Sequence, residues 1–124
     1  MTESPFLYMK KNSKTVLWND SADPKELKDA LTWGIVGATC NPVIALSALK
    51  ADQEHWVGRI KDYAKSHPTS TDDAIGWAMV KELSINAAKL FEPEFEKQNG
   101  RNGRLSIQTD PRNFRDAKAL ADQA

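Results

Sequence analysis

Three segments of this sequence run from a strand-like stretch through a polar turn into a helix start, and this repeated order most constrains the fold. The strand-like stretches are Thr15–Trp18, Ile35–Thr39 and Arg104–Thr109. The helix starts are marked by Asp23-Pro24, Asn41-Pro42 and Asp110-Pro111, which pair a capping residue with the residue favoured at the first helical position. Strands that alternate with helices in this way predict an α/β fold with a parallel sheet.

Polar side chains follow each strand, as they do at the active-site end of a (β/α) barrel. The chain has 124 residues, whereas a complete eight-stranded barrel needs roughly 250. We therefore expect a partial TIM (β/α)8 barrel made of the first three β/α units, over residues 14–124. Residues 1–13 are interpreted as a leader with weak structure. Apolar residues recur every three or four positions over Ile75–Leu90, which predicts a long amphipathic helix before the third strand.

The composition argues against several classes of protein. The chain has 17 basic and 17 acidic residues, so no net field favours nucleic acid or a membrane surface. Its one cysteine, Cys40, excludes an internal disulfide and gives no metal-binding spacing. No run approaches the roughly 20 apolar residues of a membrane-spanning helix, and residues 1–14 lack the apolar stretch of a signal peptide. We expect a cytoplasmic protein.

Asp20, Thr39 and Asn41 are candidates for chemistry at the first two strand ends. A carboxylate at Asp20 could take a proton from a substrate hydroxyl, although a loop Asp often only caps or solvates. Asn41 is first of all a helix cap, and its amide could also bind a sugar hydroxyl. Thr39 could hold a water molecule, but a β-branched residue ending a strand needs no function.

Ser106 and Gln108 are the candidates on the third strand. If Ile107 and Thr109 face the helices, alternation points Ser106 and Gln108 into the barrel. A neutral Gln in that place suggests ligand or water binding. Asp110 is expected to cap the last helix, which would carry Phe114, Ala117, Leu120 and Ala121 on one side.

Together these segments resemble the transaldolase family. The resemblance lies in Asp20 after the first strand, Thr39-Cys40-Asn41-Pro42 after the second, and Ser106-Ile107-Gln108-Thr109-Asp110-Pro111-Arg112 on the third, and it covers about residues 14–124. It implies transfer of a dihydroxyacetone unit between sugar phosphates in the pentose phosphate pathway, through a lysine Schiff base and without a metal or other cofactor. It also implies that Asp20 is the acid/base, that Asn41 holds substrate hydroxyls, and that Thr39 and Ser106 order water and substrate.

The chain departs from the family pattern at two points. Gln108 stands where transaldolases usually have Glu. The related fructose-6-phosphate aldolases resemble this chain in having Gln at that place. A Gln side chain can position water but cannot titrate. The Schiff-base lysine of the family belongs to a fourth strand, and no lysine of this chain matches it. The alternative is a truncated, non-catalytic interaction module. Three β/α units leave sheet edges open, so we also expect self-association or binding of a complementary barrel half, with Val16 or Leu17, Val36 and Leu105 exposed.

Overall fold

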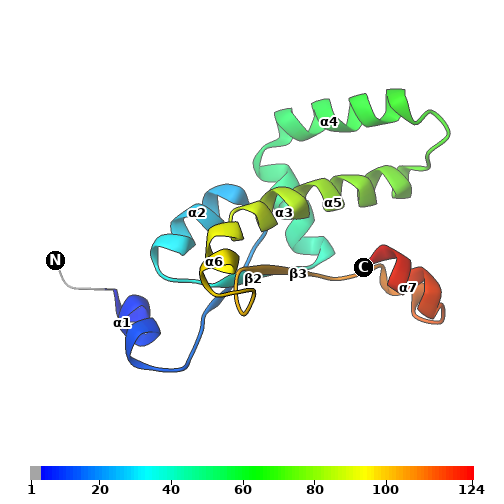
Figure 1. The fold of residues 1–124 in the computed structure, drawn as a ribbon. Coiled ribbons are helices and arrows are strands. Elements are labelled where there is room, and N and C mark those ends of the chain that lie inside the picture. Colours follow the sequence, from blue (N-terminus) through cyan, green and yellow to red (C-terminus); the bar gives the residue numbers. More distant parts are fainter. Residues whose placement is uncertain (1–3) are drawn as a thin grey trace.

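The computed structural model describes residues 4–124, and within them it has one sheet of three parallel strands and seven α-helices (Figure 1). In chain order the elements are α1 (Pro5–Asn12), β1 (Trp18–Asp20), α2 (Pro24–Thr32), β2 (Gly37–Cys40), α3 (Pro42–Ala51), α4 (Gln53–Ser66), α5 (Asp72–Lys89), α6 (Glu92–Lys97), β3 (Arg104–Ile107), a 3-10 turn (Pro111–Asn113) and α7 (Ala117–Gln123). The prediction of an α/β fold with parallel strands is confirmed.

The strands follow one another in the order β1-β2-β3, and their register places equivalent residues side by side. Asp20 pairs with Thr39, and Thr39 pairs with Ser106. One pleat earlier, Trp18, Gly37 and Arg104 form the corresponding row. Neighbouring parallel strands lie about 4.8 Å apart, so residues in one row share one face of the sheet.

The Asp/Asn-Pro pairs begin helical turns as predicted. The side chain of Asp23 accepts a hydrogen bond from the backbone N–H of Lys25, and Asn41 and Asp110 cap in the same manner. Two caps have features that the Asp/Asn-Pro pattern does not describe. Glu26 does not complete a capping box, because the backbone N–H of Asp23 donates to Ser21 instead. The cap of α5 is Thr71, because its hydroxyl accepts from the backbone N–H of Ala74.

Helices α2, α3 and α5 cover one face of the sheet, and α4 packs against α5 in a hairpin that extends beyond it (Figure 1). The core lies between these helices and β2. The core side chains on β2 are small, and larger ones come from the helices and the segment after α5. The nearly or fully buried residues include Ala38, Cys40, Ala45, Leu27, Met79, Leu83 and Phe91. We call the opposite face, not covered by these helices, the open face.

The segments before β1 and after β3 differ from expectation. Pro5–Asn12 forms helix α1, so the interpretation of this stretch as weakly structured is wrong, while residues 1–3 lie outside the described part. The last helix is broken in two. Phe114 is 70 % exposed between the 3-10 turn and α7, and α7 has its own cap in Asp116. The boundary between residues 13 and 14 stays a prediction.

The structure also corrects the predicted exposed residues. Val36 is only 1 % exposed, so it is not part of an exposed apolar face. Leu105 is half-buried, whereas Val16 is exposed. The open face is therefore mostly polar rather than apolar. Within residues 4–124 no helix is both long and apolar enough to cross a membrane.

Candidate active site at the strand ends

The carboxyl ends of the three strands bring three of the candidate residues into one row on the open face, which we call the polar row: Asp20, Thr39 and Ser106. All three side chains are exposed. The Thr39 hydroxyl donates a hydrogen bond to Oδ1 of Asp20 at 2.6 Å. This bond fixes one carboxylate oxygen and leaves the other available to a ligand, as a group that exchanges protons with a substrate requires.

A second row lies one pleat below and forms the floor of this surface. Trp18 is 42 % exposed and its ring lies over Gly37. A Cβ at Gly37 would come within 2.8 Å of the Trp18 ring and 2.7 Å of the Arg104 carbonyl oxygen, so only glycine fits there. The Arg104 guanidinium stacks on Phe95 at 5.1 Å from the ring centre. Sequence reasoning missed Trp18 as part of the site; its position two residues before Asp20 is the signal that places both on one face.

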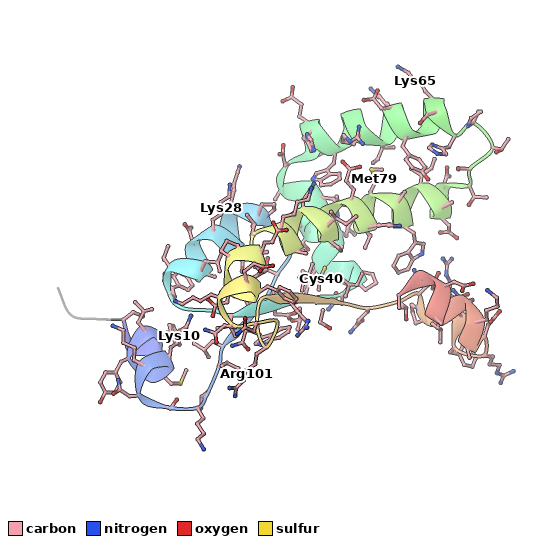
Figure 2. The ribbon with its side chains drawn as sticks, in the orientation of Figure 1. Lys10, Lys28, Cys40, Lys65, Met79 and Arg101 are labelled. Carbon is pink, nitrogen blue, oxygen red and sulfur yellow. The ribbon has the colours of Figure 1, made fainter. Side chains whose placement is uncertain are left out.

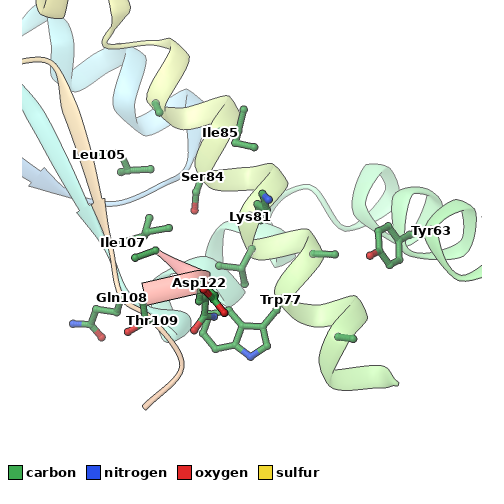
Figure 3. Close-up of a pocket in the computed structure, with 16 residues that line it drawn as sticks. Tyr63, Trp77, Lys81, Ser84, Ile85, Leu105, Ile107, Gln108, Thr109 and Asp122 are labelled. Atoms are coloured by element: carbon green, nitrogen blue, oxygen red, sulfur yellow. The ribbon is translucent and has the colours of Figure 1, made fainter. Parts of the chain in front are cut away.

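Asn41 and Gln108 follow the ends of β2 and β3 directly. The side-chain carbonyl of Asn41 accepts from the N–H groups of Val43 and Ile44, both at 2.9 Å, so the cap uses its oxygen and the amide nitrogen is the part left for a ligand. The backbone N–H of Gln108 donates to the Cys40 carbonyl at 3.3 Å and extends the sheet by one bond. The Gln108 side chain is exposed and points away from α5 (Figure 3).

Cys40 lies on the other side of β2, among the helices, and is 4 % exposed. Burial raises the pKa of its thiol, and the nearby negative charge of Asp20 raises this pKa further. A buried thiol with a raised pKa is a poor nucleophile, so Cys40 acts in packing.

Asp110 belongs to a polar cluster on the helix side and not to the polar row. Its carboxylate accepts from the side chain of Arg112 at 2.6 to 3.0 Å and from the indole N–H of Trp77 at 3.1 Å. Arg112 also pairs with Asp73 at the start of α5 at 2.7 Å. Hydrogen bonds from Arg112 lower the pKa of Asp110 to about 2. The cluster attaches the C-terminal segment to α5.

Two hollows adjoin these elements. The smaller, of about 230 Å³, borders Asp20 and is lined by the first turns of α2 and α3. The larger, of about 620 Å³, is a groove between β3, α5 and α7, and we refer to it as the groove. Leu105, Ile107 and Ile85 line it together with the buried hydroxyl of Ser84, which has no hydrogen-bond partner (Figure 3).

The lysines of the described residues lie on helices, apart from Lys14 in the loop before β1. None of the strands in residues 4–124 carries a lysine, and Lys28 and Lys65 project outward from α2 and α4 (Figure 2). Within the same residues no cluster of three or more His, Cys, Asp or Glu side chains is arranged to hold a metal ion. The polar row offers one carboxylate and two hydroxyls, and the residues that follow β2 and β3 add two amides, Asn41 and Gln108.

The model of the Transaldolase/Fructose-6-phosphate aldolase family matches residues 17–124, which include every residue of the polar row. The chain belongs to this family. The transaldolase of Kocuria rhizophila is 38 % identical to it over 93 residues, which are 75 % of this chain and 24 % of that protein.

The transaldolase of Thermobifida fusca is 31 % identical over 90 residues, which are 73 % of this chain and 24 % of the relative. Transaldolase 1 of Streptomyces avermitilis is 31 % identical to this chain over 90 residues, which are 73 % of this chain and 23 % of the relative. The chain thus spans about a quarter of the length of these family members. No solved structure matches it.

Proposed function

We propose that this chain forms the first three β/α units of a transaldolase-type barrel and supplies the acid–base side of a Schiff-base sugar phosphate enzyme of the pentose phosphate pathway in the cytoplasm. The observation that carries the proposal is the hydrogen bond from Thr39 to Asp20 at the ends of adjacent parallel strands. The Schiff-base lysine would come from a part of the enzyme that these 124 residues do not include.

Each side chain has a role in this proposal that its chemistry allows. Asp20 takes the proton from the substrate hydroxyl when the carbon–carbon bond breaks, and Thr39 holds the carboxylate in place. The amide nitrogen of Asn41 donates to hydroxyls of the dihydroxyacetone unit, because its oxygen is already used by the α3 cap. Ser106 orders water and substrate beside Thr39.

Gln108 supports a second candidate reaction, the direct aldol cleavage of a sugar phosphate. A carboxylate at this place could pass protons through water while the Schiff base forms and breaks, whereas an amide can only hold the water. If Gln108 has this role, Gln108→Glu should add one ionisation to the pH dependence of kcat. The same variant should raise the rate of transfer relative to the rate of direct aldol cleavage. An unchanged profile and an unchanged product ratio would remove Gln108 from the mechanism.

A chimaera tests the acid–base role. Residues of this chain replace the matching segment of the Kocuria rhizophila transaldolase, and turnover of fructose 6-phosphate is measured. Asp20→Asn should keep the hydrogen bond from Thr39, retain a borohydride-trapped adduct and lower kcat by about 10²- to 10⁴-fold, since an amide cannot accept the proton. Asp29→Asn, at an exposed position of α2, is the matched control. Wild-type turnover in the Asp20→Asn chimaera would contradict the proposal.

The chain by itself should give no adduct when treated with borohydride and a ketose phosphate. A Schiff-base amine needs a pKa lowered by a desolvated or cationic setting. Lys25, Lys61 and Lys81 are all exposed on helices. Stoichiometric labelling of one lysine would show that the chain carries its own nucleophile and that the division of roles proposed here is wrong.

A further inference from the structure

Glu26 joins the two residues that flank Asp20. Its Oε1 accepts from the side-chain amide of Asn19 at 3.0 Å, and its Oε2 accepts from the Ser21 hydroxyl at 2.8 Å. The Ser21 oxygen in turn accepts from the backbone N–H of Asp23 at 3.1 Å. One carboxylate in the first turn of α2 thereby holds the end of β1 and the turn after it.

This arrangement is not the one that helix capping alone would produce. A Glu three residues after a capping residue ordinarily reaches back to the backbone N–H of that cap. Here Ser21 takes that N–H, and both oxygens of Glu26 are used by Asn19 and Ser21. Ser21 is 4 % exposed, so its hydroxyl needs an acceptor inside the protein.

Two sets of hydrogen bonds position Asp20, one through its neighbours in the chain and one to its carboxylate. Alternation along β1 points Asn19 to one side of the sheet and Asp20 to the other. Glu26 therefore fixes the backbone on both sides of Asp20 without touching its carboxylate, while Thr39 fixes the carboxylate from the neighbouring strand. Glu26 also borders the same 230 Å³ hollow as Asp20.

We infer that Glu26 is a positioning residue that sets the orientation of the Asp20 carboxylate through Asn19 and Ser21. This role concerns the site for which the function above is proposed and rests on that function for its catalytic meaning. The orientation itself can be measured without any substrate.

The test uses three-bond couplings of Asp20 in the isotopically labelled, ligand-free chain, which report whether its first side-chain torsion has one value. Glu26→Ala should convert a single rotamer into an average. Glu26→Gln should restore the single rotamer, because its amide oxygen accepts from Ser21 and its nitrogen donates to a flipped Asn19 amide. Glu54→Ala is the control: Glu54 lies exposed in the first turn of α4, so only its effect on the helix dipole is lost.

A single Asp20 rotamer in folded Glu26→Ala would overturn the inference. If that variant does not fold, Asn19→Ala and Ser21→Ala each remove one arm and leave Glu26 in place; unchanged couplings in both would also overturn it. In the chimaera, Glu26→Ala should lower kcat at unchanged KM, with recovery in Glu26→Gln. Because the couplings need no turnover, a failure of the proposed reaction and a failure of this inference give different results.

Discussion

The two edges of the sheet are built by different means. At the β1 edge, α2 covers the strands with Leu27 and Ala30, both fully buried. At the β3 edge, Ile107 is 42 % exposed, and the chain beyond it is held to α5 by the polar cluster of Asp110, Arg112 and Asp73. Apolar burial contributes more free energy of folding than exposed ion pairs do. The β1 edge should therefore carry most of the stability, and the β3 edge should be the part that opens first.

Truncating one leucine at each edge tests this difference most strongly. Leu27→Ala should lower the free energy of unfolding by ~2–5 kcal/mol, because it leaves a cavity in a fully buried place. Leu120→Ala on α7 should cost about 1 kcal/mol, since this side chain is only half-buried. Urea unfolding followed by circular dichroism measures both values. Equal losses would mean that the two edges are equally packed.

Gly37 gives the next largest effect. Gly37→Ala places a methyl group within 2.8 Å of the Trp18 ring and 2.7 Å of a backbone oxygen, so we expect a loss of about 1–3 kcal/mol and a displaced indole. Gly76→Ala is the matched control, because Gly76 lies within α5 and a Cβ there meets nothing within 4 Å. The control should be stabilised by about 0.5–1 kcal/mol. Thermal unfolding distinguishes the two variants, and a stable Gly37→Ala would refute the close packing of the floor.

The sequence predicts features that depend on local pattern better than features that depend on pairing between distant segments. Strand number, parallel direction and the Asp/Asn-Pro helix starts depend on local pattern, and they are confirmed. The limits of β1 could not be read locally: Thr15–Trp18 was predicted, but pairing with Gly37–Cys40 moves the strand to Trp18–Asp20. Likewise β3 ends at Ile107 rather than Thr109. Its partner strand β2 ends at Cys40, since Asn41 already caps α3, so the residues after Ile107 have no strand to pair with.

The candidate site shows the same limit. The sequence predicts Asp20, Thr39 and Ser106 at or just after the strands, but their single row depends on the strand register and on the extension of β1 to Asp20. The link from Glu26 to Asn19 and Ser21 could not, since its spacing equally fits a capping box. The break after Asp110 was missed because the apolar spacing continued through Phe114, whereas Asp116 provides the cap that restarts the helix.

The β3 edge should also govern association. Edge strands with exposed apolar neighbours seek partners, and Ile85 and Ile107 are 46 % and 42 % exposed in the groove. We expect the chain to self-associate at micromolar concentration in sedimentation, and Ile107→Lys to shift it toward monomer. Val43→Lys, at an exposed apolar position on α3, should leave the assembly unchanged. A single monomeric species with a cooperative thermal transition would show that the groove needs no cover.

The polar cluster itself gives the smallest effect, and it depends on pH. Hydrogen bonds from Arg112 lower the pKa of Asp110 from 3.8 to about 2, so the ionised form stabilises the folded chain. That stability is complete above about pH 4 and is lost as the pH falls through about 2. The difference in urea midpoint between wild type and Asp110→Asn should therefore be largest at neutral pH and shrink between pH 4 and pH 2. All other carboxylates are common to both proteins, so their titration largely cancels in this difference. A gap that stays constant down to pH 2 would mean that the charge of Asp110 does not hold the C-terminal segment to α5.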